Sequence, residues 1–413
     1  MDESSSSLDQ GTAAVEAVEP ADNSESGEKD ETVTSISPAK RKQTSIQAEE
    51  TEEPWRSLTV ALIKAVNGVK KPIMPPVPTN VLSDHKALFE HARDCIIDYT
   101  ESGSKETILV KDAMVSMSSV LNLFATGMDN YFSEIRLEAA REACLRPDFE
   151  ENEAIAQILA PLRDVLERGG VERLHDHVIA LRGEVALRAA AGTAEPGDRF
   201  RQQVLTVMES LCTLILDPPY GTAQASEADC LYQWKSIFSA LKSKNITIHT
   251  SGEVELANIE IKSPAQSGSV PVCQNRKNVR LNRCIQRALE ELGVKNATVI
   301  GGDIVGYLGY FYTIQKFGDI FVCGPISSEA VFLPTNAAEL EDFLDGKSLS
   351  VIFNFLRTLD ELAAPATNLH LKRGLRLARV NMMSNVGPRA VTPPPKTKRL
   401  SQTVLLTPTK KRI

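Results

Sequence analysis

The sequence predicts an α+β fold, in which a helical N-terminal region is followed by a mixed sheet flanked by helices, with a disordered tail at each end. Three observations support this prediction. Apolar residues recur at helical spacing from Ser83 to about Ala191. After residue 200, short strand-like runs alternate with amphipathic helices. The two ends of the chain are poor in large apolar residues and opposite in charge.

The tails are predicted from composition. Residues 1–53 hold 14 Asp and Glu against 4 Lys and Arg, whereas the chain from Leu371 holds 11 Lys and Arg and no acidic residue, so the net charge of −8 hides this polarity. Such segments cannot bury enough apolar surface to offset the entropy of the chain. We therefore expect a disordered acidic tail over 1–53 and a disordered basic tail over 371–413.

Both tails contain a pattern that proline-directed kinases favour. Ser37 begins SPAK and Thr407 begins TPTK, and each lies beside a basic cluster. Basic runs of this kind are typical of nuclear import signals or nucleic-acid contacts, although they also serve simply as solubilising charge. We expect phosphorylation of Ser37 and Thr407, a nuclear location, and nuclear import factors and proline-directed kinases as partners.

The sequence indicates neither a membrane-spanning segment nor a disulfide framework. The start, MDESSSSLDQ, does not have the pattern of a signal peptide, and no apolar run approaches the roughly 18–20 residues that a membrane span needs. The seven cysteines are scattered, without a C-x-x-C pair, as is typical of reduced thiols in a cytosolic or nuclear protein. No membrane partner is expected.

The folded part divides into three segments. Residues 54–82, which include KPIMPPVP, are predicted to be a linker. Residues 83–191 are predicted to be a helical region, and residues 200–365 a separate α+β domain. In that domain, helix 226–244 begins with Ser226 as its N-cap. NITIHT and VELANIEIK follow as the strands of a hairpin, and NRKNVRLNRCIQRALEELG follows as an amphipathic helix. Strands ATVIGGDIV, LGYFYTIQ and DIFVCGPI and further helices complete the domain.

ELANIEIK, residues 255–262, places unlike residues on its two faces. Ala257, Ile259 and Ile261 share one face, while the other face presents Asn258, Glu260 and Lys262, because side chains alternate along a strand. The E-x-K pair has two interpretations: a solvated strand face with an ion pair along it, or a site for a metal ion and a water molecule.

The order of these elements resembles the core of the PD-(D/E)XK nuclease superfamily, which has a restriction-endonuclease-like fold. SEADCLYQWKSIF, ANIEIK, QNRKNVRLNRCIQRAL, GDIVGYLGYFY and DIFVCGP resemble segments of a group of uncharacterised fungal proteins built around such a core. The resemblance covers about residues 220–360. It implies a domain that acts on or binds nucleic acid, either DNA or RNA.

The resemblance also implies roles for individual residues. In such nucleases an Asp and the Glu of E-x-K hold Mg²⁺, while the Lys orients the attacking water. Glu260 would be the metal ligand, Lys262 the water-positioning group and Glu227 an accessory acid. Gln274 would contact either a metal-binding side chain or a phosphate group. The basic residues on the exposed side of the following helix would contact the phosphate backbone; these are Arg276, Lys277, Arg280 and Arg283.

One expected residue is missing. Nuclease relatives have an Asp on a strand between the first strand and the E-x-K strand, but only Ser251, Gly252 and Glu253 separate the two predicted strands here. Two functions stay open. The first is a degenerate, nuclear nucleic-acid-binding or protein-interaction module with weak or no cleavage. The second is an active nuclease, which would require Mg²⁺. An Asp on an intermediate strand would favour the second.

Overall fold

The protein has a mixed α/β architecture, as predicted: a helical N-terminal region and a mixed sheet flanked by helices. This computed structural model describes residues 12–17, 54–102, 107–218, 225–242, 246–249, 255–264 and 269–384. The chain divides into two compact units. We call Met1–Val18, Arg141–Gln315 and Cys323–Gly374 the sheet unit, and Glu19–Ala140, Lys316–Val322 and Leu375–Ile413 the helical unit. A search of the described residues finds no helix that could cross a membrane.

The helical unit is built from short elements around a small apolar core. They are residues 54–66, α2 (Ser83–Glu101), α3 (Thr107–Ser116), β2 (Val120–Asn122), η1 (Met128–Asn130) and most of α4 (Glu134–Cys144). Leu58, Leu62 and Phe89 are fully buried in this core. The prediction of a linker over 54–82 is therefore wrong for its first turns. Leu58 and Leu62 lie four residues apart on one helix face, a signal that the prolines after them obscured.

The sheet unit contains the predicted α+β domain together with the preceding long helices. Its helices are α5 (Pro147–Glu150), α6 (Glu153–Ala190), α7 (Asp198–Leu216), α8 (Glu227–Leu241), α9 (Ser269–Leu292), α10 (Ala337–Phe343) and the part of α11 (Lys347–Ser384) that ends at Gly374. Its strands are β1 (Thr12–Ala17), β3 (Ile246–His249), β4 (Glu255–Lys262), β5 (Val299–Val305), β6 (Leu308–Phe317), β7 (Ile320–Pro325) and β8 (Val331–Phe332). The strand order is β7-β6-β5-β4-β1-β3, and β8 pairs with β6. Because α9 connects β4 to β5, these two strands run parallel.

β1 lies between β3 and β4 and pairs antiparallel with both. The predicted hairpin of β3 and β4 is therefore wrong, since neither strand pairs with the other. The strand also lies within residues 1–53, which were predicted to be disordered. Sequence patterns did not reveal it because TAAVEA is short, follows a serine-rich acidic stretch and has its partners more than 200 residues away.

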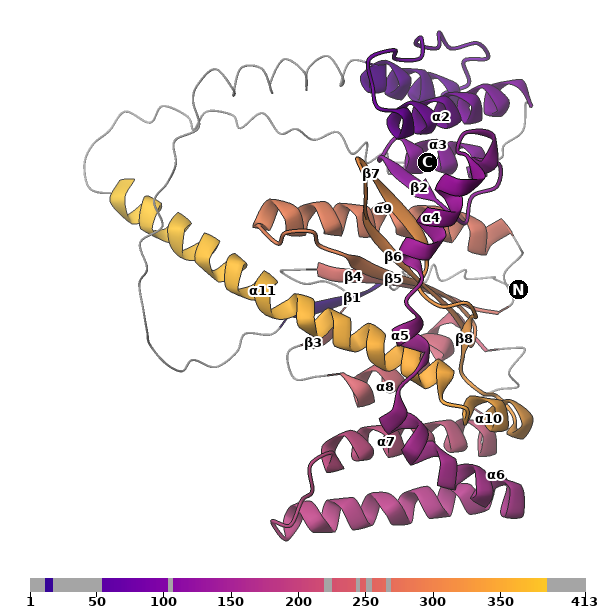
Figure 1. Cartoon of the computed structure of the whole chain (residues 1–413), viewed down its shortest axis with the longest axis vertical. Helices are drawn as coiled ribbons and strands as arrows, with labels where there is room; N and C mark the ends of the chain where they lie inside the picture. Colours follow the sequence, from indigo (N-terminus) through magenta and orange to yellow (C-terminus); the bar gives the residue numbers. More distant parts are fainter. Residues whose placement is uncertain are drawn as a thin grey trace, which may run out of the picture. The chain divides into compact units, whose positions relative to one another are not determined.

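Different helices pack on the two faces of the sheet, as Figure 1 shows: α9 lies on one face, and α8 and α11 lie on the other. Neighbouring residues of β6 show the alternation. The ring of Phe311 lies 4.9 Å from that of Phe355 on α11 and 6.4 Å from that of Trp234 on α8. Tyr312 points to the other face, where its hydroxyl accepts a hydrogen bond from Asn282 of α9.

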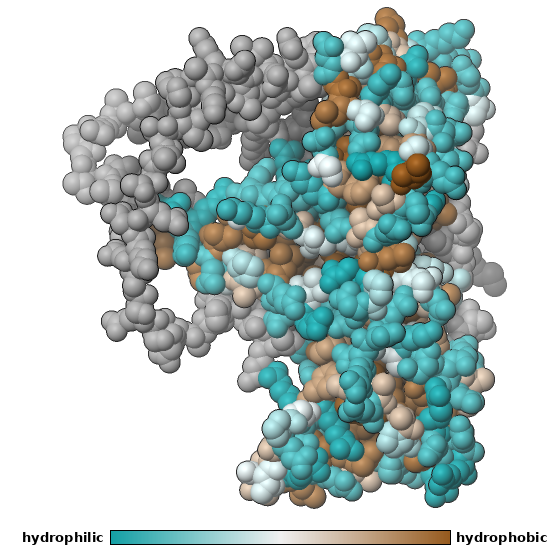
Figure 2. All heavy atoms as spheres, in the orientation of Figure 1, coloured by the Kyte–Doolittle hydropathy of each residue, from teal (hydrophilic) through white to brown (hydrophobic). Residues whose placement is uncertain are grey.

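α11 extends further than the sequence indicated. It continues to Ser384 with Pro365 inside it, so residues 371–384 are helical rather than tail, and the boundary predicted at 365 is wrong. Leu, Lys, Arg and Ala favour helix, a local preference that the charge pattern concealed. Residues 371–376 are all exposed. Hydrophilic residues cover most of the described surface in the view of Figure 2, with hydrophobic residues in smaller groups between them.

Candidate functional site

The E-x-K strand has an apolar face and a polar face, and both are buried. Ala257, Ile259 and Ile261 lie in the main apolar core, as predicted from alternation. On the opposite face, Glu260 is 4% exposed and Lys262 is 9% exposed. The interpretation of a solvated strand face is therefore wrong. α9 packs on this face with amide side chains rather than with apolar ones.

Acidic and basic side chains alternate in a row across this face. Lys262 Nζ lies 3.3 Å from Glu227 Oε1 and 3.9 Å from Glu260 Oε1. Lys277 Nζ of α9 lies 3.1 Å from the same Glu260 oxygen. Glu227 is the first residue of α8, whose N-cap is Ser226, as predicted, and Ser226 forms a capping box with Asp229. The structure thus brings Glu227, Glu260 and Lys262 together, as the sequence led us to expect, and it adds Lys277.

Asp303 is a second buried carboxylate beside Glu260. The parallel register of β4 and β5 pairs Glu260 directly with Asp303, which is 5% exposed. Asn275 Nδ2 donates to Asp303 Oδ2 at 2.9 Å, and Asn278 Nδ2 donates to Oδ1 at 3.0 Å. Burial, with a smaller contribution from the charge of the nearby Glu260, raises the pKa of Asp303 to about 6 against the opposing effect of the amide hydrogen bonds.

Sequence reasoning missed Asp303. It lies in ATVIGGDIV, which was correctly predicted to be a strand, but that prediction did not include pairing with the E-x-K strand. A signal was present, because an acidic residue in an otherwise apolar strand of a parallel pair needs a buried partner.

Amide side chains of α9 fix the helix against the sheet. Gln274 Nε2 donates to the backbone oxygen of Glu260 at 2.9 Å. Asn282 Nδ2 donates to the backbone oxygen of Asn258 at 3.0 Å, and its Oδ1 accepts from the Asn258 backbone N–H at 2.7 Å. A side chain at Gly301 would collide with the Asn282 amide and the Tyr312 ring, so the glycine permits this close approach.

The predicted cationic face of α9 is largely covered. Arg276 is only 4% exposed, which contradicts its assignment to an exposed nucleic-acid contact. Arg280 and Arg283 are half-buried, and burial lowers the pKa of both guanidinium groups, that of Arg283 to about 10. Lys277 keeps a side chain that is 43% exposed. The error arose because the apolar residues of α9 were taken to define its buried side, although its amides also face the sheet.

We call the cluster of Glu227, Glu260, Lys262, Lys277, Asp303 and Gln274 the centre. Two of its buried oxygens, Glu260 Oε2 and Gln274 Oε1, have no hydrogen-bond partner among the described residues. With Asp303, they form a set of hard oxygen donors of the kind that Mg²⁺ prefers. Across the described ranges, no group of three or more His, Cys, Asp or Glu residues is arranged to hold a metal ion. The predicted phosphorylation sites Ser37 and Thr407 lie outside the described residues.

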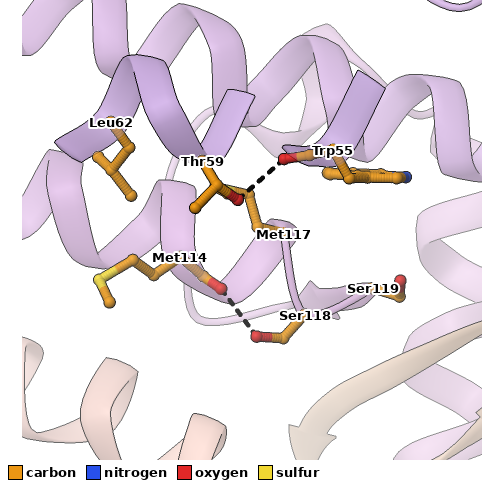
Figure 3. Close-up of a pocket in the computed structure, with 7 residues that line it drawn as sticks. All are labelled: Trp55, Thr59, Leu62, Met114, Met117, Ser118 and Ser119. Atoms are coloured by element: carbon orange, nitrogen blue, oxygen red, sulfur yellow. Dashed lines mark hydrogen bonds between the residues drawn. The ribbon is translucent and has the colours of Figure 1, made fainter. Parts of the chain in front are cut away.

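A pocket of about 160 Å³ in the helical unit does not contribute to this centre (Figure 3). Its lining residues are Trp55, Thr59, Leu62, Met114, Met117, Ser118 and Ser119. The Thr59 hydroxyl donates to the Trp55 backbone oxygen, and the Ser118 hydroxyl donates to that of Met114. The lining therefore offers no charged or titratable group, and the buried carboxylates stay the candidate site.

Comparisons with family models, with curated proteins and with solved structures gave no match to this chain.

Proposed function

We propose that this chain is a nuclear, nuclease-like protein of the PD-(D/E)XK type that binds nucleic acid and has weak or no cleavage activity. The gathering of Glu227, Glu260 and Lys262 around a buried strand supports the nuclease-like origin. The observation on which the proposal rests is that the centre is closed: Lys277 bonds the Glu260 carboxylate, whose side chain is only 5% exposed.

Hydrolysis of a phosphodiester needs a cation that substrate can reach and a water molecule placed for in-line attack. Here the ammonium group of Lys262, which would position that water, contacts Glu227 instead. Only residues 250–254 separate β3 from β4 along the chain, and none of them is the Asp that would favour an enzyme. Both points favour a module that binds nucleic acid but cleaves it weakly or not at all.

The first test is cleavage by the purified full-length protein. With Mg²⁺ present, we expect single- and double-stranded DNA and RNA to be degraded no faster than by Glu260→Ala and Lys262→Ala variants, since the centre has no open position for substrate. Gel analysis of end-labelled substrates over several hours measures this. Robust cleavage by the parent that both substitutions abolish would overturn the proposal.

An active, Mg²⁺-dependent nuclease is the second candidate, and Asp303 is the observation that favours it. It supplies the carboxylate that the sequence lacked on the intermediate strand, at the register position next to Glu260. In that case Asp303→Asn, which preserves shape while removing charge, would abolish cleavage as completely as Glu260→Ala.

The cationic surface for nucleic acid is proposed to lie on α11 rather than on α9. Lys372, Arg373 and Arg376 are exposed there, and no acidic residue follows Glu361 in the chain. Lysine and arginine bind phosphates and release counterions, so affinity falls as salt rises. The alternative is a nuclear protein-interaction module, for which the same surface would bind an acidic protein.

Charge reversal on α11 tests this assignment. The triple variant Lys372→Glu, Arg373→Glu, Arg376→Glu is expected to bind a 20-nucleotide duplex more weakly. Its plot of log affinity against log salt should be shallower by roughly two to three, because each lost phosphate contact removes about 0.9 from the slope. Fluorescence anisotropy from low to physiological salt provides the measurement.

A matched control reverses three exposed cations outside α11, at Arg173, Lys235 and Lys295. The control is expected to keep the parent's salt slope. Equal losses in both triple variants would indicate a net-charge effect, and unchanged binding in the α11 variant would place the contact elsewhere.

A further inference from the structure

The apolar pocket of the helical unit lies against helix 54–66 (Figure 3). Its volume of about 160 Å³ is close to that of an apolar cavity that holds benzene, so one Phe or Leu side chain would fill it. The ring of Trp55 packs edge-on against that of Phe89, with centroids 5.0 Å apart, which fixes one wall. Trp55, Thr59 and Met117 are half-buried rather than buried, so the pocket is open at the surface.

A stripe of exposed apolar residues continues from this pocket along the same helix. Ile63 lies four residues after Thr59, and Val66 lies four residues after Leu62, so each adjoins a residue that lines the pocket. Val60, Ile63 and Val66, which we call the stripe, are all exposed. The opposite side of the helix already packs in the core of the unit, so the stripe is the side on which a partner would be buried.

The surface around the stripe is basic. Arg56 and Lys64 lie four residues before and after Val60 and therefore on the same side of the helix, and both are exposed. Lys70, just after the helix, is exposed as well. Residues 54–83 contain four basic residues and no acidic one. A complementary partner therefore has acidic residues beside its apolar ones.

An acidic amphipathic helix fits both the shape and the charge of this surface. Pocket and stripe together extend from Trp55 to Val66, about 16 Å along the helix axis, and helices that bind in grooves use apolar anchors spaced over two or three turns. A small molecule would fill the pocket but leave the stripe exposed. A lipid surface is flat, whereas the pocket accepts one protruding side chain. Methionines such as Met114 and Met117 adapt to the shape of an apolar side chain of this kind.

We propose that the pocket and the stripe form a docking site for an acidic, amphipathic helical segment of a partner protein, with one Phe or Leu side chain in the pocket. The site lies within the helical unit. It involves neither the E-x-K strand nor α11, so it stands or falls independently of the proposed function.

The test is the binding of a synthetic peptide to the full-length protein. The probe is a fluorescein-labelled peptide of about 18 residues, or five helical turns, with Leu and one central Phe on one face and Glu on the other. Its control has every Glu replaced by Lys. Fluorescence anisotropy at physiological salt should show that the acidic peptide binds at least about tenfold more tightly than the basic one, because only the acidic peptide complements the lysines around the stripe.

Two double variants separate the apolar contribution from the charge contribution. Ile63→Ser, Val66→Ser removes apolar surface, and Lys64→Glu, Lys70→Glu reverses charge. Each is expected to weaken binding of the acidic peptide at least about tenfold. All four residues are exposed, so the melting temperature of either variant should differ little from that of the parent.

Matched controls change the same residue types elsewhere. Ile135→Ser, Leu187→Ser removes two exposed apolar side chains outside the stripe, and Lys235→Glu, Lys295→Glu reverses two exposed cations of the sheet unit. Both controls should bind the acidic peptide as the parent does. Equal binding by the parent and by Ile63→Ser, Val66→Ser would overturn the proposal, as would a parent that does not bind the acidic peptide.

A pocket-filling variant tests the anchor. Thr59→Phe places a ring in the pocket and should abolish peptide binding in a protein whose circular dichroism spectrum matches that of the parent. Should Thr59→Phe fail to fold, Ser118→Leu fills the same pocket from α3's side of it. Unchanged binding by a folded pocket-filling variant would contradict the placement of the anchor.

Two results would assign the surface to another occupant and so overturn the proposal. The first is binding to vesicles of phosphatidylcholine and phosphatidylserine, but not to the peptide, that Ile63→Ser, Val66→Ser abolishes; the occupant would then be a lipid surface. The second is a concentration-dependent dimer in sedimentation velocity that the same substitutions dissociate, since the occupant would then be a second copy of this chain.

Discussion

Replacing Trp234 with alanine is expected to destabilise the sheet unit by about 3–5 kcal/mol, the range for deleting a large buried aromatic side chain. Trp234 is fully buried on α8, and its ring lies 5.6 Å from that of Phe238 and 6.4 Å from that of Phe311. Its indole N–H donates to the backbone oxygen of Gly306 at 3.0 Å, so the substitution also leaves a buried acceptor without its donor. Urea denaturation followed by circular dichroism measures the loss.

Tyr232→Ala is the matched control for Trp234→Ala. Tyr232 lies on the same helix but is 71% exposed, and its replacement is expected to change stability by less than about 0.5 kcal/mol. A similar effect of the two substitutions would contradict the packing of α8 against the sheet.

Replacing Lys262 with methionine is expected to be equally costly. The substitution keeps the apolar stem but leaves Glu260 buried with one cation fewer, and breaking a buried ion pair from one side typically costs about 3–5 kcal/mol. The double variant Glu260→Gln, Lys262→Met should recover much of the loss, because it removes the uncompensated charge as well. Urea denaturation of Lys262→Met, Glu260→Gln and the double variant at pH 8, each compared with the parent, gives the coupling between the two residues.

The loss caused by Lys262→Met should shrink at pH 5. The pKa of Asp303 is about 6 in the folded protein against an ordinary value of 3.8, so the folded state takes up its proton first as the pH falls. Protonation between about pH 6 and pH 4 therefore favours the folded state and reduces the excess negative charge that Lys262→Met creates. A loss that is independent of pH would indicate that Lys262 contributes through packing rather than through charge.

Local patterns predicted much of this fold. Alternation along ELANIEIK placed Ile259 and Ile261 in the core, and Ser226 as an N-cap predicted the start of α8. These features depend on residues within one or two turns of each other, where spacing determines which side chains share a face.

Long-range pairing accounts for what the sequence did not reveal. β1 separates β3 from β4, and the partnership of Glu260 with Asp303 depends on the register of two strands joined by a helix. Arg276 was assigned to the surface because the apolar residues of α9 were taken to define its buried side, but its exposure depends on everything that packs against α9. Charge composition likewise concealed the helix over 371–384, since composition predicts solvation better than it predicts backbone conformation.

The place of β1 in the sheet has a consequence for the order of events during synthesis. Thr12–Ala17 is synthesised before its partners Ile246–His249 and Glu255–Lys262, which follow more than 200 residues later in the chain. The entropy of closing so long a loop grows only slowly with its length, but contacts of such high sequence separation slow the search for the native topology. β1 can therefore pair only after more than 200 further residues have been synthesised, and β3, which joins the sheet through β1, depends on the same pairing.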